Sequence, residues 1–401
     1  MTIEEKFQRL ATDSAPGQEG LQQAGPLDAL MIGDPLPGHP VDFSHGDVDA
    51  HPPTPGSLAL FTRGYEAGGE QAYTEYRGAA GIRDLLAPRL ASFTGAPVDA
   101  QSGLILTPGT QAALFLAMAS TVSQGDRVAI VRPDYFANRK IVDFLGGEAV
   151  PVALGCEDGT GLDLDQLEDA FRSGVRVFLF SNPNNPTGAV LPPDQILAIA
   201  ELAGRYGVTV IVDELYARLL YPGTTYGHLR AHLPEDAPVI TISGPSKTES
   251  LSGFRLGVAF GQPGLIERME RLQAIVSLRA PGYSQAVLRG WLDEPEGWLT
   301  ARIMAHQEIR DDLLAVLRAV PGISARTPQA GSYLFPRLPA LRMASGDFIR
   351  LLRHQAGVTV TPGTEFSPDA DDSIRLNFSQ DHETAVEAIR RLAAMVERYR
   401  A

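Results

Sequence analysis

A lysine and an arginine stand eight positions apart in the segment GPSKTESLSGFRLG, residues 244–257. The chain has 401 residues and 34 lysines and arginines together, but only three of these are lysines, namely Lys6, Lys140 and Lys247. Arginine stays protonated in proteins, whereas a desolvated lysine can become a neutral amine and act as a nucleophile. Lys247 is therefore either an ordinary loop lysine or a residue kept for amine chemistry, and its neighbours must decide.

Asp213 is the second candidate, because it follows the apolar run VTVIV at residues 208–212. A carboxylate at the end of a buried strand needs a cation or becomes protonated. One interpretation is a structural aspartate that caps the next helix. The other is a carboxylate that holds a positively charged ring nitrogen. Tyr216, three residues further on, either belongs to the core or reaches the same ligand.

The segment LTPGTQAAL, residues 106–114, turns a strand into a helix and leaves free amides at the helix N-terminus. Such amides bind phosphate, although many strand–helix turns look alike. An arginine and two serines elsewhere could complete such a site with charge-assisted and hydroxyl donors. The donors that we expect around a phosphate are Gly109, Thr110, Gln111, Ser243, Ser246 and Arg255.

The loop SNPNNPTG, residues 181–188, contains two prolines and a glycine that restrict its backbone. Its X-Pro bonds are candidates for the cis form. Asn185 would be held rigidly there and is suited to hydrogen-bond a ligand oxygen. The alternative is a tight turn whose asparagines only cap the following helix.

Together these residues offer a lysine amine, a buried carboxylate, an amide and a hydroxyl for a ring oxygen, and donors for a phosphate. Pyridoxal 5'-phosphate (PLP) requires that set, since it is held by an imine to lysine, an acidic partner for its ring nitrogen and a phosphate site. The combination favours a chemical role for Lys247, because no other side chain forms that imine.

The elements that position these residues are visible from about residue 100, where apolar runs of strand length alternate with helical patterns. Runs such as VFLF at 177–180 are typical of strands buried on both faces of a mostly parallel sheet. The candidates cluster where these runs end, and ligands of such sheets bind beyond the carboxyl ends of the strands. The sequence therefore predicts an α/β fold with one site at that edge.

Beyond residue 295 the pattern changes to helices and short strands, ending in the amphipathic segment 382–400. This change indicates a smaller α+β domain, joined by an N-terminal arm that is rich in Gly, Pro and Ala and contains one short helix. We expect the arm and part of the small domain at 1–54, a large PLP-binding domain at 55–295 and the small C-terminal domain at 296–401.

The net charge of −14 argues against nucleic acid or an anionic membrane as a partner. Cys156 is the only cysteine, so no intrachain disulfide is possible. The longest apolar run, around residues 112–119, is too short to span a bilayer, and the N-terminal segment lacks the apolar core of a signal peptide. We expect a cytoplasmic protein with no metal site.

The motifs SNPNNPTG, DELY and SK followed by GFRLG resemble those of the class I/II aminotransferases, the aspartate aminotransferase superfamily, in their order and approximate spacing. The resemblance runs from about residue 40 to the C-terminus. It implies a fold-type I PLP enzyme with a mostly parallel seven-stranded sheet flanked by helices. It also implies amino-acid and 2-oxo-acid substrates and a homodimer that shares active sites between subunits.

The resemblance implies a role for each residue of the cofactor site. Lys247 would form the imine and later move a proton between the substrate Cα and the cofactor. Asp213 would pair with the pyridine nitrogen, and Asn185 and Tyr216 would hold the phenolic oxygen. Tyr135, in RPDYFANR, would stack on the ring.

Further positions match ligands of the phosphate and the substrate. Tyr76, in TEYRGAAGIRDLL, would reach the phosphate of the neighbouring subunit, and Arg375, in DSIRLNFS, would bind the substrate α-carboxylate through both nitrogens of its fork. The amide of Gly46, in FSHGDVD, would touch the same carboxylate. The phosphate ligands implied are Gly109, Thr110, Gln111, Ser246 and Arg255.

The sequence departs from the family pattern in two places. Gly244 stands where many members have serine, which puts phosphate binding by the preceding Ser243 in doubt. The stretch SHGDVDAHPP, residues 44–53, is unusual near the substrate entrance. Arg279, in VSLRAPGYSQ, either selects an acidic substrate side chain in the adjacent subunit or is a plain surface arginine.

Three functions are compatible with these residues. The leading hypothesis is a PLP-dependent aminotransferase that moves an amino group between an L-amino acid and a 2-oxo acid. The second is a lyase, cyclase or oxidase reaction on the same scaffold, because fold alone does not separate PLP reactions. The third, a non-catalytic PLP-binding regulatory protein, is disfavoured because every catalytic position is filled.

Overall fold

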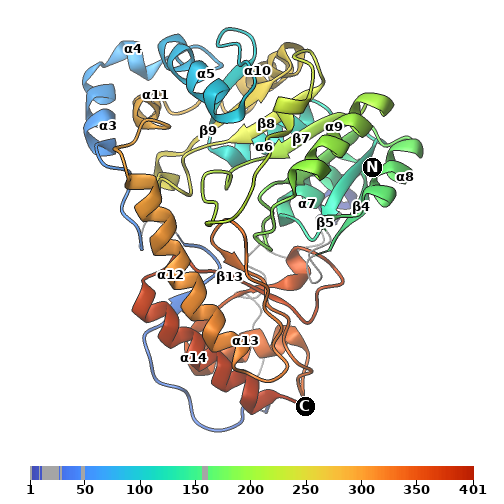
Figure 1. Cartoon of the computed structure of the whole chain (residues 1–401), viewed down its shortest axis with the longest axis vertical. Helices are drawn as coiled ribbons and strands as arrows, with labels where there is room; N and C mark the ends of the chain where they lie inside the picture. Colours follow the sequence, from blue (N-terminus) through green and yellow to red (C-terminus); the bar gives the residue numbers. More distant parts are fainter. Residues whose placement is uncertain (1, 9, 11–26, 28, 47–49, 156–160) are drawn as a thin grey trace.

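The computed structural model describes residues 2–8, 10, 27, 29–46, 50–155 and 161–401. Cys156 and residues 47–49 of the unusual 44–53 stretch lie outside this description. The chain forms a large lobe built around one sheet and a smaller lobe of helices and short strands, with the C-terminus at the end of the small lobe (Figure 1).

The sheet of the large lobe has eight strands in the order β2-β9-β8-β7-β6-β3-β4-β5. The pairs β3–β4, β3–β6, β6–β7 and β7–β8 are parallel, whereas β9 runs antiparallel to β2 and β8. The two-residue β5 adds an eighth, antiparallel strand to the seven long ones that were expected. The strands are β2 (Leu104–Pro108), β3 (Arg127–Arg132), β4 (Glu148–Gly155), β5 (Gly161–Leu162), β6 (Val177–Ser181), β7 (Thr209–Asp213), β8 (Val239–Ser243) and β9 (Leu256–Gly261).

Helices cover both faces of this sheet, as the continuous apolar strands predict. Side chains of β7 alternate between faces: Val210 and Val212 pack in a cluster with residues of α8 and α9, and Ile211 packs in another with residues of α6 and α10. The helices around the sheet are α5 (Ala80–Thr94), α6 (Thr110–Ala119), α7 (Phe136–Leu145), α8 (Leu164–Arg172), α9 (Pro193–Tyr206) and α10 (Pro263–Val276).

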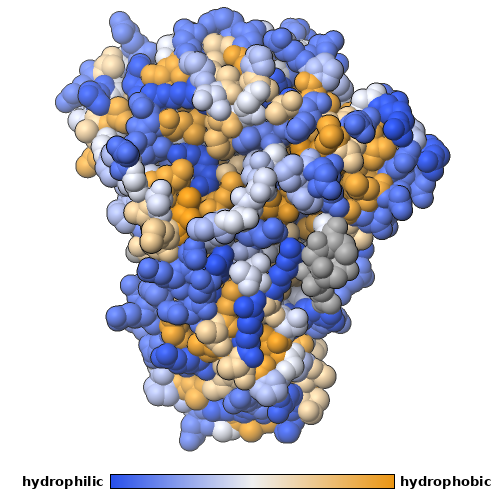
Figure 2. All heavy atoms as spheres, in the orientation of Figure 1, coloured by the Kyte–Doolittle hydropathy of each residue, from blue (hydrophilic) through white to orange (hydrophobic). Residues whose placement is uncertain are grey.

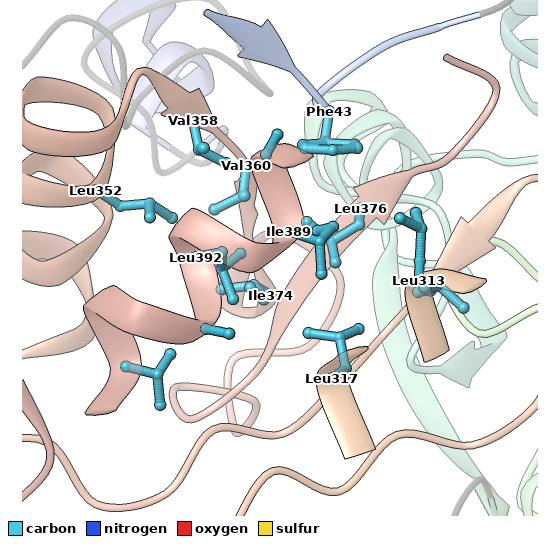
Figure 3. Packing of buried hydrophobic residues seen from close by; sticks show 14 of the residues in the cluster. Phe43, Leu313, Leu317, Leu352, Val358, Val360, Ile374, Leu376, Ile389 and Leu392 are labelled. Atoms are coloured by element: carbon cyan, nitrogen blue, oxygen red, sulfur yellow. The ribbon is translucent and has the colours of Figure 1, made fainter. Parts of the chain in front are cut away.

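The small lobe packs three helices on short strands around its own core. Figure 3 shows Ile389 and Leu392 of one helix facing Ile374 and Leu376 of a strand, with Phe43 of the N-terminal segment closing the cluster. The elements of this lobe are α12 (Trp298–Arg318), α13 (Ser345–Ala356), α14 (His382–Tyr399), β10 (Tyr333–Leu334), β12 (Thr361–Pro362) and β13 (Ile374–Asn377), with β1 (Val41–Asp42) paired to β11 (Val358–Thr359).

The N-terminal segment touches both lobes. Its one described helix, α1 (Ile3–Gln8), lies on α7, where the rings of Phe7 and Phe144 are 6.1 Å apart. Phe43 belongs instead to the core of the small lobe. We propose domain boundaries at 1–54, 55–295 and 296–401 on this distribution of core residues. Among the described helices, none is long and apolar enough to cross a membrane.

Candidate active site

A cavity of about 270 Å³ lies at the carboxyl ends of the sheet strands, where the small lobe closes over them. Ten of the predicted site residues line it, together with groups from β10 and β13 of the small lobe. Those ten are Thr110, Gln111, Tyr135, Asn185, Asp213, Tyr216, Ser246, Lys247, Arg255 and Arg375. The convergence of strand ends that the sequence predicts is therefore present in the described structure.

A second cavity, of about 680 Å³, lies between the lobes but contains none of the predicted residues. Two of its arginines already have acidic partners, since Arg132 pairs with Asp369 at 2.8 Å and Arg337 with Asp372 at 2.7 Å. Size alone therefore does not identify the site, and it is the smaller cavity that the predicted residues line.

One end of the cavity is built from the start of α6 and from Arg255. The amides of Ala112 and Ala113 donate to the Gly109 carbonyl, at 3.2 and 3.3 Å. The preceding amides of Thr110 and Gln111 have no acceptor within the helix, as is usual for the first amides of a helix. A Cβ on Gly109 would lie 2.5 Å from a guanidinium nitrogen of Arg255. Helix amides and an arginine that meet in this way form an anion site.

Close backbone contact holds that end in place. Gly257 of β9 passes so near the turn that a Cβ there would lie 2.5 Å from both the Gly109 carbonyl carbon and the Thr110 nitrogen. Gly244 is similarly confined, with the Thr110 methyl 3.0 Å from its ideal Cβ position. Ser243 does not line the cavity, so the role in phosphate binding that the sequence left in doubt gains no support.

Asp213 opens into the cavity from the end of β7. One carboxylate oxygen accepts a hydrogen bond from the Leu215 amide at 3.0 Å, and turns rather than a helix follow it. The helix-capping interpretation is therefore wrong. Burial raises the pKa of this carboxyl to about 6, against the opposing effect of the Leu215 amide. Among the described residues no cation pairs with it, so the carboxylate is available to a cationic ligand.

Two tyrosines present hydroxyls to the same space. The Tyr216 hydroxyl lies 2.5 Å from that of Tyr333, and the Tyr135 hydroxyl donates to Gln111 Oε1 at 3.0 Å. Burial raises the pKa of Tyr216, and the adjacent Tyr333 raises it further. Its hydroxyl therefore stays protonated near neutral pH and can donate to a ligand oxygen.

Arg375 reaches the cavity from β13 of the small lobe. Its two terminal nitrogens donate to Asn185 Oδ1 at 3.1 Å and to the Ser44 carbonyl at 2.7 Å, while its Nε is buried without a partner. The guanidinium lies over the rings of Tyr333 and Phe366, 4.5 and 4.7 Å from their centroids. No described carboxylate pairs with this cation although it is only 5% exposed, so the guanidinium is available to an anionic ligand.

The loop at residues 181–188 is held by its own side chains. Asn184 donates to the Pro133 carbonyl at 3.0 Å and accepts from Thr187, and Asn182 accepts from the Leu191 amide at 3.0 Å. The Asn182–Pro183 bond is cis, in agreement with the prediction. The following helix α9 has Pro192 before its first residue and no side-chain cap, so the capping alternative is wrong.

Three of the predicted residues lie outside this cavity. Gly46 is buried beside β13, where a Cβ would lie 2.5 Å from the Ser379 carbonyl oxygen. Tyr76 is 45% exposed and lies under the guanidinium of Arg279, 5.1 Å from its ring centroid. The third residue is Gly109, which lies next to the cavity-lining Arg255. Gly46 likewise lies next to a cavity-lining residue, Asn377.

The sequence prediction missed several lining residues. Tyr333 and Asn377 come from the small lobe, whose short strands gave no clear signal, and Ser44 and His45 come from the N-terminal segment. Ser181 was quoted within its loop but given no role, although β6 pairs with β7 and sets Ser181 opposite Asp213. The strand-end rule applied to each strand in turn would have found it.

Comparison with known proteins now decides the family, because residues 41–392 match the model of aminotransferase class I and II. The chain belongs to this family. A solved structure described as an aspartate aminotransferase from Rhodobacter sphaeroides is 64% identical, with a TM-score of 0.95 and full coverage of both chains. An aspartate aminotransferase from Sulfolobus acidocaldarius is 30% identical over 81% of this chain and 83% of its own.

A third relative widens the range of named substrates within the family. An arginine–pyruvate transaminase from Pseudomonas aeruginosa is 28% identical over 88% of each chain. The fold and the aminotransferase function predicted from the sequence are confirmed by these matches. The substrates of aminotransferases are amino acids and 2-oxo acids, and the roles of individual residues follow as proposals.

Replacing Gly257 with alanine should damage the anion site specifically. The new methyl would push the Gly109–Thr110 backbone away from Arg255, and displacement by about 1 Å can cost about 10²-fold in rate. We expect such a loss in steady-state transamination rate. Gly253→Ala is the control, because nothing lies within 4 Å of its ideal Cβ position. Wild-type rates for Gly257→Ala would show that this contact does not set the site.

Proposed function

We propose that the cavity binds PLP and that the enzyme uses it to transfer an amino group between an L-amino acid and a 2-oxo acid. One observation carries the proposal. Lys247, Arg255 and Arg375 face a single cavity, and none of these cations has a carboxylate partner among the described residues. The cavity is thus complementary to a ligand with several negative charges, and Asp213 provides for one positive charge.

The residues present fit this cofactor. The amides of Thr110 and Gln111, the Ser246 hydroxyl and Arg255 would hold the phosphate, and Asp213 would hold the ring nitrogen. Tyr135 would stack on the ring, and Asn185 and Tyr216 would donate to its oxygen. Bound PLP supplies an electron-withdrawing ring that stabilises negative charge at the substrate Cα.

The chain's own residues then handle the substrate. Arg375, fixed by Asn185 and Ser44, would bind the α-carboxylate and orient the Cα–H bond. The Gly46 amide would touch the same carboxylate. In its neutral form, the Lys247 amine would accept the proton from the substrate Cα and hold it for return, and no described group hydrogen-bonds or pairs with this amine.

We propose aspartate as the amino donor. Support comes from the 64% identical structure, described as an aspartate aminotransferase. The arginine–pyruvate transaminase at 28% identity is the alternative, so a panel of amino donors in the half-reaction decides between acidic and basic side chains. A cytoplasmic location is also proposed, on composition alone.

We further propose a homodimer that completes each site with Tyr76 of the other chain. Large apolar side chains are exposed around α3 (Ser57–Glu66), α4 (Gly69–Ala72) and the end of α10, and exposed clusters of this kind mark interfaces. They are Leu58, Tyr65, Tyr73, Tyr76, Ile275, Val276 and Leu278. Figure 2 shows hydrophobic patches between hydrophilic side chains on one face of the molecule.

Lys247→Ala should abolish transamination, since general acid–base catalysis alone contributes about 10²–10⁴-fold and the imine is lost as well. Borohydride reduction of the wild-type enzyme with PLP should fix the cofactor on one lysine, which peptide mass mapping should identify as Lys247. Lys6→Ala, on α1, is the matched control and should keep full activity. Near-wild-type turnover in Lys247→Ala would eliminate the proposal.

Arg375→Lys should raise the KM for the amino donor by about 10- to 100-fold, because an ammonium cannot reproduce the forked contact and a charged hydrogen bond contributes about 1.5–3 kcal/mol. Exposed Arg390 of α14 provides the control substitution Arg390→Lys. Steady-state kinetics with a saturating 2-oxo acid measure the effect. An unchanged KM would assign carboxylate binding to another group.

Mixing Lys247→Ala with Tyr76→Ala should restore activity above the average of the two variants. In a mixed dimer one site would combine an intact lysine with an intact tyrosine from the opposite chain, and random re-pairing makes about a quarter of all sites wild type. Native mass spectrometry verifies the exchange. If exchanged mixtures give only the average, Tyr76 acts within its own chain.

A further inference from the structure

A second buried carboxylate, Asp134, lies behind the wall of the cavity. It follows β3, precedes Tyr135 and is only 3% exposed. Its Oδ1 accepts hydrogen bonds from the Tyr135 amide at 2.8 Å and from the Ser181 hydroxyl. Its Oδ2 accepts from Asn138 Nδ2 at 2.9 Å. All of these partners are neutral donors, and the carboxylate itself does not line the cavity.

Asp134 is joined to the ring-nitrogen end of the proposed cofactor site. Ser181, which donates to it, pairs in register with Asp213 and lines the cavity. Tyr135, whose amide donates a hydrogen bond to Asp134, is the residue proposed to stack on the cofactor ring. The two acids therefore approach the same end of the cavity, Asp213 directly and Asp134 through one intervening side chain.

This pair of acids has no protein cation. No lysine, arginine or histidine of the described chain lies within ion-pair distance of Asp134 or Asp213. Burial, with a smaller contribution from the nearby Asp213, raises the pKa of Asp134 to about 7 against the opposing effect of its hydrogen bonds. Ionising two buried acids is costly without a cation nearby. A cationic ligand would lower the pKa of both acids and stabilise their ionised forms.

We propose that Asp134 is a second, remote counter-charge for the protonated ring nitrogen of the cofactor. It is a positioning residue that acts through Ser181 and across the low-dielectric wall rather than by contact. The inference rests on the proposed PLP site and extends it, because the ring-nitrogen end then presents two negative charges instead of one.

The alternative is that Asp134 serves only to hold Tyr135, Ser181 and Asn138 in place. Asp134→Asn separates the two roles because it removes the charge and can keep the hydrogen bonds. Asn138 Oδ1 is buried without a partner, so a flip of the Asn138 amide lets that oxygen accept from the new Nδ2 at residue 134. The remaining oxygen at 134 still accepts from Tyr135 and Ser181.

The experiment compares two cofactors on two proteins. Cofactor-free wild type and Asp134→Asn are titrated with PLP and with its 1-deaza analogue, in which a C–H group replaces the ring nitrogen. Tryptophan fluorescence and cofactor absorbance at pH 8 give the dissociation constants. A unit charge several ångström away, at an effective dielectric constant of about 20, changes an equilibrium by about tenfold or more.

We expect Asp134→Asn to raise the dissociation constant of PLP about tenfold and to change that of the 1-deaza analogue by no more than about twofold. Equal weakening of both ligands would overturn the inference in favour of a structural role, and so would unchanged PLP binding. A wild-type protein that binds neither ligand would refute the PLP proposal itself, which keeps the two failures distinct. If thermal unfolding shows that Asp134→Asn is not folded, Asp134→Ser, which is smaller and uncharged, takes the same test.

Discussion

A sheet that is covered by helices on both faces is apolar along most of each strand and presents its charged side chains to a ligand where the strands end. The central residues of β6, β7 and β8 are buried, and the last residues of these strands are Ser181, Asp213 and Ser243. Because these strands are parallel, their carboxyl ends share one edge. The rest of the site depends on this constraint, since the loops that follow the strands must carry the chemistry.

The electrostatics of that edge follow from the shortage of acids around its cations. Arg255 lies against the Gly109 backbone and Arg375 lies over the rings of Tyr333 and Phe366, and neither guanidinium has an ion pair among the described residues. A cation that is placed without a protein counter-ion binds anions without first breaking an internal salt bridge. Arg132 and Arg337 of the larger cavity are each paired with an aspartate and lack this property.

The site also depends on the contact between the lobes. Arg375 and Tyr333 come from the small lobe, and Asn185 and Tyr216 come from the large one. Their bonds, Arg375 to Asn185 and Tyr333 to Tyr216, cross the boundary at the cavity. Movement of one lobe relative to the other would therefore change the proposed substrate contacts and the proposed cofactor contacts together.

The sequence by itself determined the α/β class, and it predicted a site at the strand ends and most of the residues that line the cavity there, from Lys247 to Arg375. This was possible because strands and turns are determined largely by apolar residues, prolines and glycines that are close together in the sequence. The motifs of the family also lie within such short segments. Only the tertiary structure decided that Tyr333, Asn377 and Ser44 join the site and that Asp134 lies behind it. These residues are brought there by packing between segments that are distant in sequence. A local sequence pattern also does not show whether a buried carboxylate has a cationic partner in the folded protein.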